Sequence, residues 1–152
     1  MKKVIAILVA VFAFVAVASA QPRALGIRAG LSGVELSYQN TLGAPHFLEA
    51  DLGVAFRTGY TGLSLRLAYD FVFASANNWN FYAGPSVGLT FVSVKDSGSS
   101  VVPTFGAQVG VEYEIPGAPL NISLDYRPAL AYAGGNVTFI PADVALGVRF
   151  RF

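Results

Sequence analysis

The sequence predicts an all-β fold in which eight antiparallel strands close into an up-and-down β-barrel. Three features of the 152 residues lead to this prediction: segments in which apolar and polar residues alternate, short polar turns between them, and no long apolar run after residue 20. Successive side chains of a strand point to opposite faces, so alternation with period two marks a strand whose two faces meet different surroundings. The chain carries no repeat or linker that would divide it.

Residues 1–20 are predicted to be a secretory signal peptide, and residues 21–152 to form the β-barrel. Lys2 and Lys3 precede an apolar run from Val4 to Val17, and Ala18-Ser19-Ala20 provides small residues for cleavage. The alternative is an uncleaved helical anchor, although the run is shorter than the roughly 20 apolar residues that a membrane-spanning helix needs. The mature chain would then begin near Gln21.

The last segment shows the alternation most clearly. One face of residues 144–152 is apolar throughout, with Val144, Leu146, Val148, Phe150 and Phe152. The other face carries Asp143, Ala145, Gly147, Arg149 and Arg151. The segment is therefore predicted to be a strand with an apolar face directly opposite a charged one.

Seven further segments alternate in the same way and complete an even count of strands. The first four are 24–31, 34–39, 47–58 and 63–74, and the next three are 81–94, 104–115 and 120–132. Ser32-Gly33 is predicted to be a two-residue hairpin turn that pairs Leu31 with Val34. Residues 95–103 and 133–141 are predicted to be loops, and Pro85 predicts a bulge or a weakened pairing because it lacks an N–H donor.

The charged residues of the strands fall on the face opposite the apolar one. They are Arg28, Glu35, Glu49, Asp51, Arg57, Arg66, Asp70, Glu112, Glu114, Asp125, Arg127, Asp143, Arg149 and Arg151, whereas Arg23, Lys95 and Asp96 are placed outside the strands. An eight-stranded barrel encloses little more than room for side chains. We therefore expect a luminal network of arginine and carboxylate pairs, since buried charges are tolerated only when paired.

The distribution of aromatic residues indicates which face meets lipid. Aromatic residues gather near both ends of the apolar strand faces, for example Phe71, Phe81 and Phe150 at one end and Phe91 and Phe105 at the other. Two aromatic girdles around an aliphatic band match the two interfaces of a bilayer. The alternative is a soluble lipocalin-like barrel or secreted sandwich with the apolar face as its core.

The composition excludes several classes of site. The sequence has no cysteine, which removes disulfides, thiolate metal sites and cysteine nucleophiles, and its formal net charge is only +1. No basic patch indicates nucleic-acid binding. We expect no cofactor and no metal.

The chain resembles the small eight-stranded outer-membrane β-barrel proteins, the OmpA/OmpX-like family. The most specific part is Gly147-Val148-Arg149-Phe150-Arg151-Phe152, which is similar to the carboxy-terminal signal read by the barrel-assembly machinery. Its signal positions here are Gly147, Val148, Phe150 and Phe152. The resemblance implies residence in a bacterial outer membrane, contact with its lipids and a structural role in the envelope, with no surface ligand indicated. A narrow porin-like channel for small solutes and a lipid A-modifying enzyme stay open as alternatives.

No catalytic site is predicted. Enzymes on this scaffold that deacylate lipid A use a His and a Ser two residues apart, but His46, the single histidine, is followed by Phe47 and Leu48 in a predicted turn. The pairs Glu49/Asp51 and Glu112/Glu114 have a spacing that could serve a carboxylate dyad or an oxygen-ligand metal site. Ion pairing with luminal arginines is the preferred interpretation of both pairs.

Overall fold

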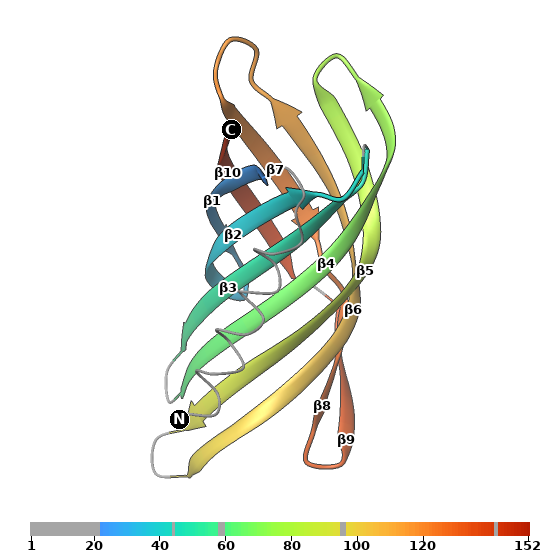
Figure 1. Ribbon diagram of the computed structural model, residues 1–152. Coiled ribbons are helices and arrows are strands. Elements are labelled where there is room, and N and C mark those ends of the chain that lie inside the picture. Colours follow the sequence, from blue (N-terminus) through green and yellow to red (C-terminus); the bar gives the residue numbers. More distant parts are fainter. Residues whose placement is uncertain (1–21, 44, 58–59, 95–96, 142) are drawn as a thin grey trace.

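The structure is a computed structural model that describes residues 22–43, 45–57, 60–94, 97–141 and 143–152. The predicted signal peptide, residues 1–20, lies outside the described residues. The described chain forms ten strands (Figure 1). They are β1 (Pro22–Gly30), β2 (Gly33–Thr41), β3 (Phe47–Arg57), β4 (Tyr60–Ala76), β5 (Trp79–Val94), β6 (Gly98–Glu114), β7 (Leu120–Tyr126), β8 (Ala129–Ala133), β9 (Asn136–Ile140) and β10 (Val144–Arg151).

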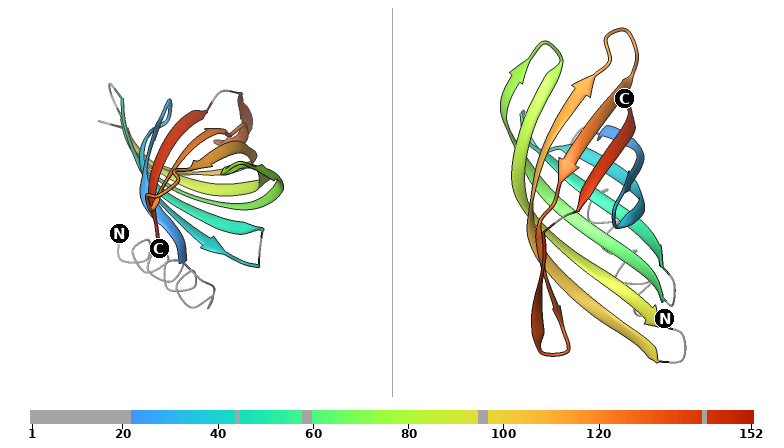
Figure 2. Two further views of the ribbon diagram at one scale, coloured as in Figure 1. Left: turned by 90° about the horizontal axis from the view of Figure 1, so that it is seen from above. Right: turned by 180° about the vertical axis from the view of Figure 1, so that it is seen from behind.

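The sheet closes on itself as a barrel of eight antiparallel strands. Each strand from β1 to β6 pairs with the next, β7 pairs with β10, and β10 pairs with β1 from Ala24↔Arg151 to Gly30↔Ala145. β8 continues the path of β7 beside β6, and β9 leads into β10. Each of these two pairs of short strands therefore counts as one of the eight strands of the barrel, and we call each of the eight a wall. The walls surround a common interior in the view from above (Figure 2). The predicted all-β, eight-stranded antiparallel barrel is thus confirmed.

The barrel has two ends, which we name by their turns. The terminal end holds Pro22, Phe152 and the turns after β2, β4 and β6. The far end holds the turns after β1, β3, β5 and β8. The strands differ in length, because β4, β5 and β6 have 17, 16 and 17 residues whereas β1 and β2 have nine each.

The first hairpin differs from the predicted register by two residues. Gly30 pairs with Gly33 and Ala29 pairs with Val34, so the two-residue turn is Leu31-Ser32 and not Ser32-Gly33. A shift of two leaves every side chain on the face that the pattern assigned to it, because the period of a strand is two. The predicted inner and outer faces of this hairpin are therefore correct although its predicted register is wrong.

Two predicted loops are largely strand. Within 95–103, β6 already begins at Gly98, where it pairs with Val94 of β5, and within 133–141 the residues Asn136–Ile140 form β9. Serine and glycine favour turns in isolation, but an adjacent long strand offers a complete ladder of hydrogen-bond partners. The turn after β8 is confined to Gly134 and Gly135, both of which have positive φ.

Prolines interrupt the ladder where the sequence predicted a continuous strand. Residues 127 and 128 separate β7 from β8, since Pro128 has no N–H to donate, although Ala107 N still donates to the Pro128 carbonyl at 3.1 Å. Beside Pro85 the β4–β5 ladder pairs Ala68 with Ser86 and Phe71 with Ala83 in one register. The ladder has no pair at Pro85 or Gly84, so the pairing is weakened there without a bulge, and the register shift of these two strands lies between Val72 and Ala74.

The two faces of the wall have opposite character. The outer face exposes large apolar side chains, among them Ile27 at 61%, Leu146 at 54% and Phe105 at 60%. The inner face buries charged ones, and Arg28, Arg127 and Arg149 are all 0% exposed. No helix in the described part of the chain is long and apolar enough to cross a membrane.

Candidate functional site: the charged interior

Alternation along the strands places the polar side chains of several walls in one shared interior. The buried charged residues are Arg28, Glu35, Glu49, Asp51, Asp70, Glu112, Asp125, Arg127, Asp143 and Arg149, all belonging to the predicted network. Arg66, Glu114 and Arg151 are partly exposed at the two ends. The side chain of Arg57 lies outside the described part of the structure. The interior contacts fall into three layers along the barrel axis.

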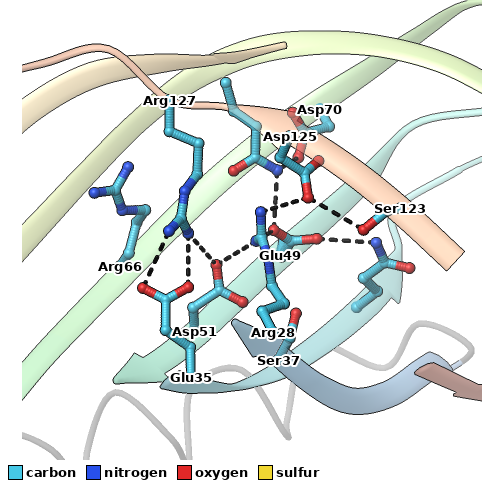
Figure 3. A network of polar contacts seen from close by, with 12 residues as sticks. Arg28, Glu35, Ser37, Glu49, Asp51, Arg66, Asp70, Ser123, Asp125 and Arg127 are labelled. Carbon is cyan, nitrogen blue, oxygen red and sulfur yellow. Dashed lines mark hydrogen bonds and ion pairs between the residues drawn. The ribbon is translucent and has the colours of Figure 1, made fainter. Parts of the chain in front are cut away.

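The central layer is organised around Arg28 of β1 (Figure 3). Its Nη1 donates to Asp51 Oδ2 of β3 at 2.7 Å and also to Glu49, and its Nη2 donates to Asp125 Oδ2 of β7 at 2.6 Å. One guanidinium therefore meets three carboxylates from two other walls. A planar fork of donors suits this arrangement, since it can serve several acceptors in fixed directions.

Arg149 of β10 completes the central layer from the opposite side of Glu49. Its Nη2 donates to Glu49 Oε2 at 2.8 Å, while Nε and Nη1 donate to the hydroxyls of Ser37 and Ser123 at 2.9 and 2.8 Å. Glu49 thus lies between two arginines and also accepts a hydrogen bond from Gln108 Nε2 at 2.9 Å. These protein donors replace the water that would otherwise hydrate the Glu49 carboxylate, as a buried charge requires.

Asp70 belongs to the same layer but has a different environment. Gln108 Nε2 donates to its Oδ2 at 3.1 Å, and its Oδ1 is buried without a hydrogen-bond partner. No arginine forms an ion pair with it among the described residues. The structure therefore brings Asp70 into the interior without giving it the ion pair that the sequence analysis assumed for each luminal carboxylate.

The layer toward the far end is held by Arg127, which lies between β7 and β8. Its Nη1 donates to Glu35 Oε2 at 2.7 Å, and its Nη2 lies 3.0 Å from Asp143 Oδ2. Arg66 of β4 approaches the same Asp143 oxygen at 3.4 Å. The backbone break at Pro128 is the place where Arg127 enters the interior, and its N donates to the Asp143 carbonyl at 2.8 Å.

The layer at the terminal end includes Arg23, which the sequence analysis placed outside the strands. Arg23 is the extra residue of a bulge in β1, because Pro22 pairs with Asn40 and Ala24 already pairs with Gln39. A bulge redirects one side chain against the alternation. The Arg23 guanidinium forms an ion pair with the buried Glu112 and lies 4.3 Å from the centroid of the Phe47 ring.

The remaining groups of this layer are amides and a second ion pair. Asn121 Nδ2 donates to Glu112 Oε2 at 2.8 Å, and Asn80 Nδ2 donates to Glu114 Oε1 at 3.0 Å. Arg151 Nη1 lies 2.9 Å from Glu114 Oε2 near the opening, with 37% of its side chain exposed. Glu112 and Glu114 share Arg23 and Asn80 as partners, so this pair of carboxylates is engaged by an arginine and an amide of other walls.

Uncharged interior residues carry part of the network and were not singled out from the sequence. They are Ser37, Gln39, Asn40, Phe47, Tyr82, Ser86, Gln108, Asn121 and Ser123, all buried. Tyr82 is 0% exposed and its hydroxyl donates to Asp125 Oδ1. Except for Asn40, these positions follow the alternation of inward-facing residues along their strands, so the alternation contained the signal that would have found them.

His46 and the carboxyl-terminal residues lie outside the interior. The His46 ring packs against Phe71 with centroids 5.0 Å apart in an edge geometry, so it is a half-buried member of an aromatic cluster and not a fully solvated turn residue. Val148, Phe150 and Phe152 are exposed on the outer wall, while Gly147 faces inward beside Ser123 and Arg28. Their predicted role in assembly stays a prediction.

The interior groups can brace the walls of the barrel against one another. No cluster of three or more His, Cys, Asp or Glu side chains that could hold a metal ion occurs in the described ranges. Every ion pair named above joins residues of different walls. The fold and interior together define a class of protein: a closed eight-stranded antiparallel β-barrel with an apolar exterior and a charged, ion-paired interior.

The comparisons with known proteins support the fold. No protein-family model and no curated protein sequence matches the chain. The structure is similar to the crystal structure of Neisserial surface protein A (NspA), with a TM-score of 0.62 and 16% sequence identity over 86% of this chain and 94% of that chain. At this identity the likeness shows a shared barrel architecture.

Proposed function

We propose that this protein is an integral β-barrel of a bacterial outer membrane with a structural role in the envelope, filled by its own charged side chains. One observation carries the proposal: the hydrophobic and charged faces are inverted relative to a water-soluble barrel. Leu146 and Ile27 are 54% and 61% exposed on the outside, while Arg28 and Arg149 are 0% exposed inside. An apolar outer band facing lipid and a polar interior characterise transmembrane barrels.

Two further observations support a bacterial outer membrane as the location. The sequence begins with a segment that has the features of a secretory signal, and the barrel resembles a protein named as a Neisserial surface protein. Exposed aromatic side chains also lie near both ends of the outer wall, with Phe71, Trp79 and Phe150 toward the terminal end and Tyr132 toward the far end. Aromatic rings at the two interfaces would anchor the barrel at a fixed depth.

The proposal assigns no channel, enzyme or cofactor function to the interior. Arg28, Arg127 and Arg149 each contact carboxylates from other walls, so the same side chains that would line a water path are engaged with each other. The partners in this proposal are outer-membrane lipids, and the barrel-assembly machinery during biogenesis. The porin-like channel is the competing outcome in the experiment below.

The test is to express residues 21–152, refold the protein into lipid vesicles and measure insertion and conductance in the same preparation. Insertion is followed by vesicle co-flotation, protease resistance and a gel shift that is lost on boiling. A structural barrel is expected to insert and pass no steady current. Steady single-channel current would replace the proposal by the porin-like channel, and folded protein that remains in solution without detergent would contradict membrane residence altogether.

A further inference from the structure

Asp70 is the buried carboxylic acid of the interior that has no positively charged partner. The residue is 0% exposed, and none of the ion pairs among the described side chains includes it. The side chain of Arg57 is not described, but Arg57 lies at the opposite end of β3 from Phe47, the residue that pairs with Asp70. A strand of 11 residues is roughly 35 Å long, so an arginine at that end cannot reach Asp70.

The adjacent walls offer Asp70 few hydrogen-bond donors. Phe47 is its cross-strand neighbour on β3, and Gly84 of β5, where a Cβ would lie 3.0 Å from the Asp70 Cα, contributes no side chain. Gln108 Nε2 donates to Asp70 Oδ2 at 3.1 Å and to Glu49 Oε1 at 2.9 Å, so one amide group serves two carboxyl groups. Asp70 Oδ1 is buried and accepts no hydrogen bond. An ionised carboxylate with an unsatisfied oxygen is costly in a buried position.

The central layer around Asp70 contains more negative than positive groups. Its two arginines and four carboxylic acids are all buried: Arg28, Arg149, Glu49, Asp51, Asp70 and Asp125. Arg28 forms ion pairs with the three other acids, and Arg149 forms one with Glu49. The Tyr82 hydroxyl of β5 donates to Asp125. The charged groups that act most strongly on Asp70 are three carboxylates and one arginine, namely Glu49, Asp125, Asp51 and Arg28.

The two other layers of the interior do not supply the missing positive charge. Each of them pairs two arginines with two carboxylates among the described side chains. The pairs are made by Arg66, Arg127, Glu35 and Asp143 toward the far end, and by Arg23, Arg151, Glu112 and Glu114 at the terminal end. The excess of acids is therefore confined to the central layer, and Asp70 is the acid of that layer that no arginine contacts.

A proton is the ligand that fits this position. A metal ion would need several oxygen ligands around it, and the described ranges contain no group of three or more His, Cys, Asp or Glu side chains that could hold one. A proton needs no cavity, removes the unpaired charge and converts one carboxyl oxygen of Asp70 into a donor. Gln108 Oε1 is also buried without a hydrogen-bond partner, so the neighbourhood of Asp70 contains an acceptor that lacks a donor.

We propose that Asp70 is a proton-binding site of the barrel interior, neutral in the folded protein at neutral pH, and that folding of the barrel takes up this proton. An aspartate in an unfolded chain is ionised at neutral pH, so the folded state binds one proton more than the unfolded state at this position. Loss of the proton from the folded barrel would place a fourth carboxylate charge in the central layer. Through this one side chain the stability of the interior depends on the proton concentration. The proposal does not rest on the proposed role in the envelope, because it is defined by the interior alone.

The first test measures proton uptake when residues 21–152 refold from urea into octyl glucoside at neutral pH. A pH-indicator dye in weakly buffered solution reports the protons. The wild type is expected to take up about one proton more per barrel than Asp70→Asn, because asparagine has nearly the same shape and does not titrate. Glu114→Gln is the matched control: it removes a partly exposed carboxylate that is paired with Arg151, and it is expected to take up as many protons as the wild type.

The second test reads the protonation state of the folded barrel directly, so it does not require Asp70→Asn to refold. Infrared spectra of the wild type, with ¹³C in the side-chain carboxyl group of aspartate, are expected to show the C=O stretch of a neutral carboxyl group. This band should shift with the isotope and be lost in Asp70→Asn. Absence of the labelled band, or equal proton uptake by the wild type and Asp70→Asn, would overturn the proposal. Loss of the band when sodium chloride replaces choline chloride at equal ionic strength would also overturn it, in favour of a bound sodium ion. Membrane insertion of the barrel is unaffected by any of these outcomes.

Discussion

The guanidinium of Arg28 in β1 lies 2.6 Å from the carboxylate of Asp125 in β7, joining residues that are 97 positions apart in the chain. β10 lies between β1 and β7 in the sheet, so these two strands are joined through the side chains of Arg28 and Asp125 and not through a shared backbone ladder. Arg28 also meets Glu49 and Asp51 of β3. A single side chain therefore braces three walls of the barrel.

Replacement of Arg28 should destabilise the barrel strongly. Arg28→Gln leaves three carboxylates without their common cation, and removing one partner of a buried ion pair costs about 3–5 kcal/mol. The free energy of unfolding can be measured in detergent by urea titration, with the fluorescence of Trp79, the single tryptophan, as the probe. Arg151→Gln is the control, with an expected loss of about 1 kcal/mol or less for a partly exposed pair. Equal losses in the two variants would show that the central layer does not brace the barrel.

Gly84 should not tolerate a side chain. A Cβ at Gly84 would lie 1.7 Å from the carbonyl oxygen of Tyr69, which belongs to the backbone of the adjacent strand and cannot turn away. Gly84→Ala is expected to lower the free energy of unfolding by about 3 kcal/mol or more, through overpacking. At Gly53 the nearest atom is the rotatable Ser64 Oγ at 2.5 Å, so Gly53→Ala should cost about 1 kcal/mol. The reverse order of the two losses would contradict the close approach of β4 and β5.

The free-energy cost of placing a charge on the outer wall should depend on whether that position lies within the membrane. Leu146 and Val137 are similarly exposed, at 54% and 64%, but Val137 lies beside the turn at Gly134-Gly135 and Leu146 lies within β10. If lipid covers this wall, Leu146→Arg should cost about 2–4 kcal/mol and Val137→Arg about 0–1 kcal/mol. The comparison is made by urea titration in lipid vesicles. Near-neutral effects of both substitutions would indicate that water and not lipid surrounds the barrel.

Phe152 is predicted to act in assembly more than in stability. Its ring is 61% exposed and its only aromatic neighbour among the described residues is Phe150, at a centroid distance of 6.2 Å. Deletion of Phe152 should therefore reduce the heat-modifiable, folded fraction in cells while leaving refolding of the purified protein in detergent nearly unchanged. Phe139→Leu, at an exposed aromatic away from the chain end, serves as the control for general loss of aromatic surface. A deletion that fails in both settings would indicate a structural role.

The backbone amides of β9 should exchange with solvent faster than those of β10. Among the described strands, β9 pairs with β8 alone, whereas β10 pairs with both β1 and β7. The β8–β9 hairpin reaches beyond the turn between β1 and β2, so the other edge of β9 has no neighbouring strand (Figure 2). Singly paired strands open at lower free energy, which hydrogen exchange in micelles measures residue by residue. Equal protection of β9 and β10 would show that another group covers this edge.

The fold was largely predictable, because the face on which a strand side chain lies depends on whether its position along the strand is odd or even. Alternation assigned Arg28, Glu49 and Asp125 to the inner face and Ile27 and Leu146 to the outer face, and the structure places them there. Even the first hairpin, whose turn is Leu31-Ser32, keeps its faces because the register error is two residues. The errors concern strand ends: residues 98–103 and 136–140 are strands because a neighbouring strand offers partners that local composition does not reveal.

The partners within the interior could not be predicted in this way. The sequence placed Arg23 outside the strands, whereas a bulge turns it toward Glu112. It also treated Asp70 as one of many paired carboxylates, although its described contact is with Gln108. Which arginine meets which carboxylate depends on strand order and tilt, and those are properties of the closed sheet.

Alternation along the chain was enough to assign the all-β class, the two faces of the wall and the set of charges that share the interior, because side-chain direction in a strand repeats every two residues. The closure of β1 on β10, the three-way contact of Arg28 and the incomplete pairing of Arg66 become visible in the folded barrel alone. Those features arise when walls distant in the chain curve around one interior, and the distances between their side chains then follow from the geometry of the barrel.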